Sequence, residues 1–501
     1  MAEWQSTISP AALGRLLGTA RLPEPAGGHR PAYLLLARQL QLLLGEGRLA
    51  VGTRLPAERE LAGALALSRT TIATAYQTLR TEGYLHSRRG AGSWTALPEG
   101  SHPPGNALFP LPPDERERLI DLGVASPPGP QALLARAAAR AVELLPAYAG
   151  GHGHYPTGLP VLREVVAQRY TERGLPTTPD QLLITSGALS ALGLVRSTLL
   201  RTGDRVAVET PSYAHVLQGL RAEGARLVAV PQQRESPEQL PRWDLAQWQR
   251  VLHGAAPRLA YVVPDFHNPT GALIGEDQRR TLLGAARAAG TLLLVDETMA
   301  ELNWHTPDDR MPRPTAALDR AAQVITVGSA GKLAWGGLRV GWVRAAPALI
   351  RQLADERVHH DLATSVLDQL VCATMLGELL PELRALRLGQ LRASAAALLP
   401  ALRAQLPHWR FAEPAGGLTL WLDTAGLSGA ALARAGERTG VRIAAGSRFG
   451  VDGAFEAFVR VPLTVPPAAA ALTAERLAAT AELAARDAAQ TWGADQPTLA
   501  V

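Results

Sequence analysis

The chain holds a single lysine, Lys332, against 49 arginines. An arginine stays protonated in proteins, whereas a lysine amine can lose its proton and act as a nucleophile. Because arginine replaces lysine everywhere else, we expect this one position to need an amine. Ser329 precedes Lys332 by three residues and Arg339 follows it by seven, in VGSAGKLAWGGLRVGW. The pattern predicts a positioned amine nucleophile with two anion-binding side chains beside it.

Three further motifs carry polar groups at the ends of apolar runs. Asp296 ends the run LLLVD, where a buried carboxylate is costly unless it is paired. The segment LLITSGALSALGLV (182–195) predicts a strand, a Ser-Gly turn and a helix whose first N–H groups suit an anion. Asn268 and Pro269 predict a tight turn that aims an amide into a site. Taken singly, each of these residues is more often a cap, a turn or a surface charge.

The elements that must position these residues are short apolar runs that alternate with helical stretches. The expected strands lie at 182–185, 205–209, 226–230, 258–264, 291–297 and 323–328. Such alternation predicts an α/β fold with a mostly parallel sheet that is covered on both faces. We assign residues 121–344 to this large domain. Long Ala/Leu-rich helices and expected strands at 418–422, 441–445 and 457–461 make residues 345–501 a helical segment and a small α+β domain.

The N-terminal part of the chain differs in pattern and charge. Residues 1–96 are helical in pattern and end in a Gly/Arg-rich hairpin, and residues 97–120 form a proline-rich linker. Between residues 29 and 96, nine arginines face four glutamates, an excess of +5 that equals the net charge of the whole chain. This asymmetry indicates a polyanionic partner for the N-terminal segment.

The order of helices in this segment predicts a winged helix-turn-helix. A helix at 33–45 precedes a second near 57–64 and a third at 68–83, which Ser68 would cap. YLHSRRGAGSWTA then reads as the two strands of a wing. Over about 65 residues, the motifs LPAERELA, SRTTI and RRGAG resemble the GntR family of transcription regulators. The resemblance implies double-stranded DNA as a partner, contacted by Arg59, Ser68, Arg69, Thr70 and Thr71 and, at the wing tip, by Arg88, Arg89 and Gly90.

The remaining motifs, taken in order, resemble the fold-type I enzymes of the aspartate aminotransferase superfamily, over roughly residues 121–490. The resemblance implies pyridoxal 5'-phosphate (PLP) as cofactor, with Lys332 as the Schiff-base residue. It implies that Asp296 keeps the pyridine nitrogen protonated, that Asn268 bonds the phenolic oxygen and that Tyr213 stacks on the ring.

The same resemblance implies the groups that bind anions. The cofactor's phosphate would lie among the backbone of Ala188 and Leu189, Ser329 and Arg339. Tyr155 would reach the phosphate of a neighbouring subunit, which implies a homodimer. Arg460, in FVRVPL, would clamp the carboxylate of an amino-acid ligand. No metal site is expected.

Four positions depart from the family patterns. Met299 stands where aminotransferase relatives have a tyrosine that bonds the phenolic oxygen, and this loss should weaken activation for proton transfer. Gly331 replaces the usual serine before the lysine, and Gly336 replaces a frequent proline. In the head, Ala73 stands where many relatives carry a basic residue.

A GntR head fused to an aminotransferase-like body resembles the MocR subfamily of regulators. This implies a PLP-dependent DNA-binding regulator that senses an amino acid, an amine or PLP itself, in a head-to-tail swapped dimer. The main alternative is an active aminotransferase of the aminoadipate type with an accessory head. A single cysteine, Cys372, and the lack of a signal peptide or a membrane-spanning run favour the cytoplasm.

Overall fold

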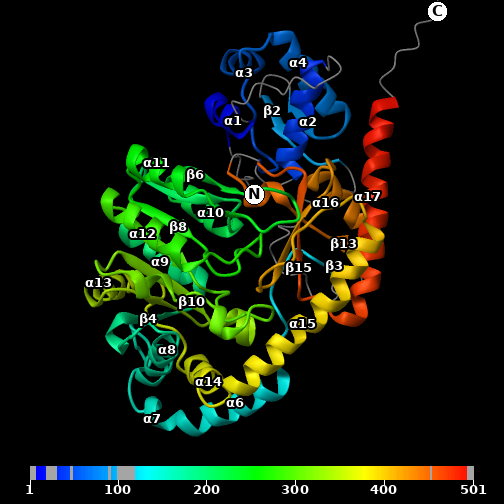
Figure 1. Ribbon diagram of the computed structural model, residues 1–501. Coiled ribbons are helices and arrows are strands. Elements are labelled where there is room, and N and C mark those ends of the chain that lie inside the picture. The colour runs from blue at the N-terminus through cyan, green and yellow to red at the C-terminus, as the bar shows by residue number, and fades with distance from the viewer. Residues whose placement is uncertain are drawn as a thin grey trace, which may run out of the picture.

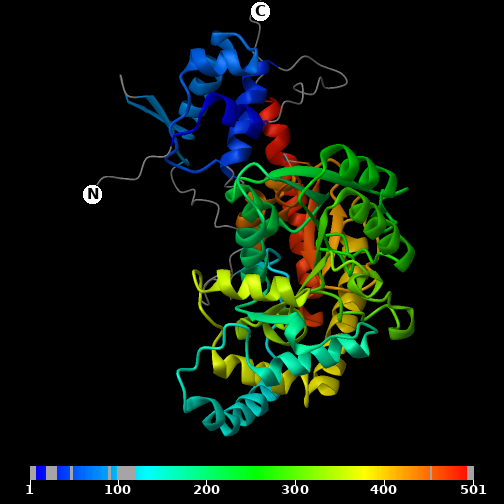
Figure 2. The same cartoon turned by 90° about the vertical axis from the view of Figure 1, so that its left-hand side faces the viewer.

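A winged helix-turn-helix head stands on one end of a larger α/β body in the computed structural model (Figures 1 and 2). The structure describes residues 7–17, 31–45, 49–88, 92–98, 119–451 and 454–493. The predicted wing tip, with Arg89 and Gly90, and most of the predicted linker lie outside these residues.

The head consists of four helices and a two-stranded antiparallel wing. These are α1 (Pro10–Leu17), α2 (Ala32–Gly45), α3 (Glu58–Leu65), α4 (Arg69–Thr81), β1 (Leu85–Arg88) and β2 (Gly92–Thr95). Buried leucines of α2, α3 and α4 and Ile72 form a core separate from those of the body. The sequence predicted α2, α3, α4 and the wing, whereas α1 was not predicted.

The body is built on an eight-stranded mixed sheet of order β4-β11-β10-β9-β8-β5-β6-β7. Its strands are β4 (Leu182–Thr185), β5 (Arg205–Thr210), β6 (Arg226–Gln233), β7 (Arg242–Trp243), β8 (Leu259–Val262), β9 (Leu292–Asp296), β10 (Val324–Ser329) and β11 (Gly341–Arg344). The five strands from β10 to β6 run parallel, and β4, β11 and β7 are antiparallel to their neighbours.

Helices cover both faces of this sheet, as the predicted fold class requires (Figure 1). The large-domain helices are α6 (Gln131–Leu144), α7 (Pro146–Ala149), α8 (Pro160–Glu172), α9 (Ala188–Leu199), α10 (Ala214–Ala222), α11 (Leu245–Ala255), α12 (Glu276–Ala289), α13 (Pro347–Arg357) and α14 (Val366–Leu376). Side chains alternate between two cores along each strand: Leu293 and Val295 of β9 join one, and Leu294 joins the other. The continuous apolar runs of the sequence follow from this double burial.

The small domain contains a three-stranded sheet of order β12-β15-β14 flanked by long helices. Its elements are β12 (Thr419–Asp423), β13 (Val441–Arg442), β14 (Ala444–Ala445), β15 (Phe458–Pro462), α15 (Leu380–Gln405), α16 (Gly429–Thr439) and α17 (Ala470–Gly493). A short strand from far upstream, β3 (Ile120–Asp121), pairs in parallel with β13. The chain therefore enters the body through the small domain.

Two predicted boundaries differ from the packing. The limit set at residue 120 falls inside β3. Both residues of β3 pair with β13. The limit set at residue 344 precedes α13 and α14, yet α13 packs on α9 and α14 packs on α6 and α8 of the large domain. Although the amino-acid composition changes at residue 344, α13 and α14 still pack in the large domain.

Candidate functional site

Lys332 lies in a π-helical turn, Gly331–Trp335, that directly follows β10. Its Nζ donates a hydrogen bond to the carbonyl oxygen of Ala125 at 2.7 Å. Burial, and then Arg460 and Arg339, lower the pKa of this amine and Asp296 raises it, with a net pKa of about 8. A usable fraction of Lys332 is therefore unprotonated near neutral pH, as a nucleophilic amine requires.

Asp296 ends β9, the strand beside β10, and is buried. Its Oδ2 accepts a hydrogen bond from the Tyr261 hydroxyl at 2.8 Å, and its Oδ1 accepts one from the Thr298 N–H at 2.9 Å. Burial, and then Asp296, raise the pKa of Tyr261 well above its usual value, so this phenol stays a donor. Sequence reasoning missed Tyr261. In the sequence, a tyrosine within the otherwise aliphatic strand β8 is the feature that could have indicated a buried hydrogen-bond donor.

An anion cradle forms where α9 begins. Gly187 has φ +95° and caps this helix, and the Arg339 guanidinium donates to the Ser186 carbonyl at 2.9 Å. A Cβ on Gly187 would lie 2.7 Å from Arg339 Nη2, so glycine is what lets the guanidinium approach the helix N-terminus. The Ser329 hydroxyl, at the end of β10, accepts from the Gly331 N–H at 3.0 Å.

The predicted phosphate ligands divide into backbone and side-chain groups. Ala188 is the first residue of α9, and its N–H is one of those that a helix leaves unpaired. The Leu189 side chain is 39% exposed, so this residue offers the site its backbone alone. Ser186 belongs to the Ser-Gly turn before α9, and the sequence predicted no role for its side chain. Its hydroxyl donates to Asp361 at 3.0 Å.

Tyr213 and Asn268 follow two neighbouring parallel strands, β5 and β8. Burial, and then Asp296, raise the pKa of Tyr213 to about 12. The ring of Tyr213 lies 5.2 Å from His215, which sequence reasoning missed. Burial lowers the pKa of His215, and Arg448, Lys332 and Arg460 lower it further. The side-chain oxygen of Asn268 is buried and has no hydrogen-bond partner within the described residues.

A fully buried pair, Glu209 and His267, holds the turn that carries Asn268. Glu209 Oε2 on β5 lies 2.7 Å from His267 Nε2, and His267 Nδ1 lies 2.9 Å from the Thr270 hydroxyl. Trp243 Nε1 also donates to Glu209. Since His267 precedes Asn268 directly, this network ties the Asn268 amide to the central sheet. Both residues act through Asn268 and are positioning residues.

Arg460 approaches the site from β15 of the small domain and is buried. Its Nη2 donates to the carbonyl oxygens of Leu122, at 3.3 Å, and Gly123, and its guanidinium lies 5.5 Å from the Phe449 ring centre. Burial lowers the pKa of Arg460 to about 10, so it remains a cation at neutral pH. The guanidinium that was predicted to bind a ligand's carboxylate therefore donates to backbone carbonyls in this structure.

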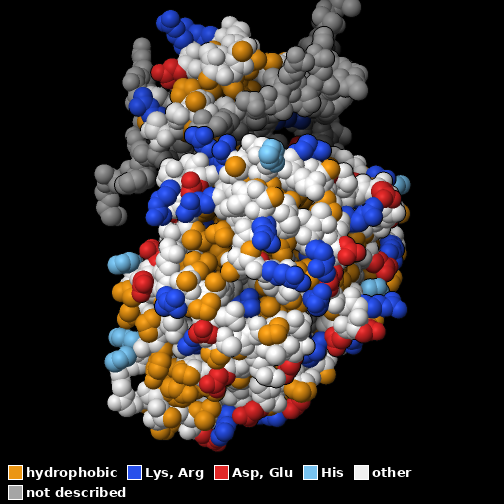
Figure 3. Space-filling model, turned by 60° about the vertical axis from the view of Figure 1, so that its left-hand side comes forward, with side chains coloured by type: hydrophobic (Ala, Val, Ile, Leu, Met, Phe, Trp, Pro, Cys, Tyr) orange, Lys and Arg blue, Asp and Glu red, His pale blue; other side chains and the backbone are white. Residues whose placement is uncertain are grey.

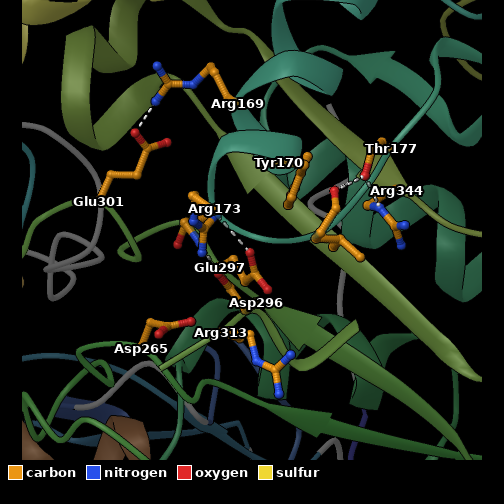
Figure 4. Close-up of polar contacts among 12 residues, drawn as sticks. Arg169, Tyr170, Arg173, Thr177, Asp265, Asp296, Glu297, Glu301, Arg313 and Arg344 are labelled. Carbon is orange, nitrogen blue, oxygen red and sulfur yellow. Dashed lines mark hydrogen bonds and ion pairs between the residues drawn. The ribbon is translucent and has the colours of Figure 1, made fainter. Parts of the chain in front are cut away.

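A cluster of charged side chains surrounds Glu297, the residue that follows β9 (Figure 4). Successive residues of a strand point to opposite faces, so Glu297 turns away from the cofactor side and pairs with Arg173 at 3.1 Å. Arg169 pairs with Glu301, and Arg279 with Asp265 at 2.7 Å. These pairs satisfy most of the charge behind the site and hold α8 and α12 to the sheet.

The candidate DNA-binding residues lie where the helix-turn-helix predicts. The Ser68 hydroxyl caps α4 by accepting from the Thr71 N–H at 3.0 Å, while Ile72 and Ala75 face the core. Arg59, Ser68, Arg69 and Thr70 are exposed and Thr71 is half-buried. Arg69 Nε lies 3.7 Å from Glu58, but this exposed pair contributes little. Arg88 belongs to β1. Basic side chains project from the outer end of the head (Figure 3).

Tyr155 lies in the loop before α8, with its ring edge-on to Tyr148 at 6.0 Å. Its reach into a neighbouring subunit remains a prediction.

The structure brings seven predicted residues to one edge of the sheet, at the carboxyl ends of its parallel strands. They are Lys332, Asp296, Tyr213, Asn268, Ser329, Arg339 and Arg460. In the described ranges, no group of three or more His, Cys, Asp or Glu side chains is arranged to hold a metal ion. None of the described helices has the length and apolarity to cross a membrane.

Comparison with known proteins supports both halves of this architecture. The aminotransferase class I and II family model matches residues 117–477, and the bacterial gntR regulatory family model matches residues 32–94. An uncharacterised HTH-type transcriptional regulator of Bacillus subtilis, YisV, is 28% identical over 78% of this chain and 85% of its own length. The probable rhizopine catabolism regulatory protein MocR of Rhizobium meliloti is 29% identical over 65% of this chain and 66% of its own.

The body also resembles an enzyme without such a head. The 2-aminoadipate transaminase of Thermus thermophilus is 32% identical over 56% of this chain and 70% of its own length. A crystal structure of α-aminoadipate aminotransferase LysN from Thermus thermophilus, complexed with N-(5'-phosphopyridoxyl)-L-leucine, has a TM-score of 0.67 and 28% identity. The match covers 74% of this chain and 94% of that one.

The chain belongs to the aminotransferase class I and II family and carries a gntR-type DNA-binding head. This combination is that of the MocR-type regulators, as the sequence predicted, and the cofactor of the body is PLP. The residues present fit this cofactor. Lys332 offers a partly unprotonated amine, and Asn268 carries an amide NH2 group that can donate to the phenolic oxygen. Gly187 leaves room for Arg339 at a helix N-terminus.

Capture of PLP by the apo-protein should accelerate as pH rises toward about 8 and level off above it. The neutral form of Lys332 reacts, and its pKa lies at about 8. Arg460→Met removes a cation that lowers this pKa, so the rise should move to higher pH. Stopped-flow absorbance over roughly pH 6 to 10 measures both profiles. A flat profile, or a shift to lower pH in the variant, would contradict the assignment of Lys332.

His267→Leu should raise the pH at which the absorption band of bound PLP titrates, whereas His267→Gln should move it less. A donor to the phenolic oxygen favours the deprotonated cofactor form, and a displaced Asn268 no longer supplies that donor. The leucine variant should also lose roughly 3 kcal/mol of stability, because Glu209 is left buried without its histidine. Leu282→Ala, in the core under α12, controls for destabilisation. If His267→Leu lowers Tm but leaves the spectral titration unmoved, the pair is structural only.

Proposed function

We propose that the protein is a PLP-dependent DNA-binding transcription regulator whose body senses an amino acid, an amine or PLP and whose head binds an operator. The observation that supports this is the fusion itself: a head with an exposed Arg69 on α4 is joined to a body whose Lys332 has a lowered pKa beside Asp296 and Arg460. Neither half alone would distinguish a regulator from an enzyme. We place it in the cytoplasm, where its DNA partner lies.

When bound, PLP supplies an aldehyde that condenses reversibly with an amine and releases water. Lys332 would hold the cofactor covalently, and Asp296 would keep its pyridine nitrogen protonated. Tyr213 would cover the ring, while Arg339, Ser329 and the α9 N-terminus would bind the phosphate. An incoming amine could then exchange with Lys332, and Arg460 would select ligands that also carry a carboxylate.

Met299 favours sensing over turnover. It is buried in the core next to the turn after β9, where relatives carry a phenol. A thioether cannot donate a hydrogen bond, so one group that tunes the cofactor for proton transfer is absent at this position. Replacement of Lys332 by another amine would break no C–H bond, whereas transamination would have to remove the proton from the ligand's Cα.

A dimer is the second part of the proposal. Trp335 and Leu189, which flank Lys332 and the anion cradle, are 40% and 39% exposed. Large apolar side chains on both sides of a polar site suit a surface that a second chain covers. Tyr155 of that second chain would complete the phosphate site, and each head would rest on the other body. Two heads per dimer would bind two half-sites.

The alternative is an aminotransferase with an accessory head, which the likeness to 2-aminoadipate transaminase favours. A further possibility is a regulator whose effector is PLP itself.

Titration of the PLP-loaded protein with each of the twenty amino acids should shift the spectrum for an effector without sustained turnover. Lys332→Ala should abolish the borohydride-stable label on residue 332 while the head keeps its fold. Sustained conversion of an amino acid with an oxoacid would promote the aminotransferase. A protein that takes up no PLP would overturn the cofactor-dependent reading.

Arg69→Ala should weaken binding to an operator selected by the wild-type protein from random duplexes by about 1–3 kcal/mol, if Arg69 pairs with a base. The matched control is Arg250→Ala, an exposed arginine on α11 of the body. Fluorescence anisotropy at fixed salt measures both. Equal affinity in Arg69→Ala and Arg250→Ala would show that the assigned recognition-helix register is wrong.

A further inference from the structure

One segment of backbone holds both reactive cations of the site. Residues 122–130, here called the strap, follow β3 directly and run over Lys332. The Ala125 carbonyl accepts from Lys332 at 2.7 Å, and the Leu122 and Gly123 carbonyls accept from Arg460. Leu122, Gly123 and Ala125 are all buried. The strap therefore offers carbonyl oxygens to the groups that PLP and a carboxylate would use.

A third cation, Arg387, anchors the far end of the strap. Arg387, buried on α15, donates to the carbonyl of Pro128 at 2.9 Å and to those of Leu333 and Ala334, which follow Lys332. This contact does not involve the ligand-binding groups. The strap is thus fixed at residue 128. At residues 122–125 its described hydrogen bonds join Lys332, Arg460, the Asp121 carboxylate and the Arg442 carbonyl, and the side chains of Leu122 and Ala125 pack in the core.

The tethered end of the strap is the part nearest the head in the chain. Leu122 N–H donates to Arg442 of β13 at 2.8 Å, and Ile120 N–H donates to Gly440 at 3.0 Å. β13 directly follows α16, and α16 lies against α2 of the head. Residues 119–121 are also where the chain coming from the head enters the body. Motion of Leu122 and Gly123 would reach the head through β13 and α16.

We propose that the strap competes with the effector's carboxylate for Arg460, so that ligand binding frees residues 122–125 and alters β3, β13 and the contact of α16 with the head. This rests on the proposed function, because it takes Arg460 as the carboxylate clamp. A charged guanidinium binds a carboxylate more strongly than two neutral carbonyls, which sets the direction of the exchange. Lys332 would leave the Ala125 carbonyl on binding PLP, so in the loaded protein Arg460 would be the cation that still donates to residues 122–125.

Removing the guanidinium should therefore free the strap without any effector. In the full-length PLP-loaded protein, Arg460→Met should raise amide hydrogen exchange at Leu122 and Gly123 by about ten-fold or more, because hydrogen bonds to a charged group stabilise a contact by at least that factor. Both N–H groups are bonded, to Arg442 and Asp121, and so report the closed strap. Mass spectrometry of peptides spanning residues 119–130 and 429–442 gives the readout.

The matched control is Arg163→Met. Arg163 also donates to two backbone carbonyls, those of Leu182 and Pro179, but outside the strap. Exchange in β8 and β9 monitors the global fold. If Arg460→Met unfolds the body, Arg460→Lys decides instead, since an ammonium keeps the charge but lacks the planar fork that reaches both carbonyls.

Strap amides that stay as protected as in wild type would overturn the proposal while leaving PLP and operator binding, and hence the proposed function, intact. Faster exchange in the strap but not in α16 and β13 would overturn the route to the head. If strap exchange rises equally in Arg460→Met and Arg163→Met, the effect is global and the proposal is rejected. Failure to take up PLP would instead count against the proposed function.

Discussion

Two cations, the half-buried Lys332 and the buried Arg460, lie near one another, and much of the site follows from the free-energy cost of removing them from water. Burial, and then Arg460, lower the pKa of Lys332 to about 8, and burial lowers the pKa of Arg460 to about 10. Within the described residues, their hydrogen bonds go to backbone carbonyls, and Asp296 is the carboxylate that raises the pKa of Lys332. A site with this charge balance is suited to an anionic cofactor and an anionic ligand.

The central sheet is the rigid frame that positions the other residues of the site. Asp296 ends β9, and Asn268, Tyr213 and Lys332 lie in the turns after β8, β5 and β10, so four parallel strands bring them to one edge of the sheet. Behind them, the Glu209–His267 pair and the Glu297–Arg173 pair fix the turns after β8 and β9. Because both pairs are buried, each is strong only while both partners are present. The small domain, by contrast, contributes Arg460 through backbone carbonyl contacts that a ligand can replace.

Much of this could be predicted from residue patterns. The strands of the large sheet, the helix-turn-helix and the positions of Lys332, Asp296, Asn268 and Arg339 follow from apolar periodicity and from motifs that are local in the chain. Tyr261, His215 and Glu209 could not be assigned in the same way, since their partners lie on other strands and helices. The pairing of Ile120–Asp121 with Val441–Arg442 joins segments more than three hundred residues apart, and no local pattern marks it.

The sequence by itself determined the chemistry: one amine in a chain of arginines, a basic head and an aminotransferase-like body. These are properties of residue type and of short-range order, which are present before folding. Only the tertiary structure decided that Arg460 and Lys332 share one strap, and that this strap begins where the head's chain enters the body. Hydrogen bonds from side chains to distant backbone carbonyls carry no signature in the sequence, because every residue has a carbonyl to offer.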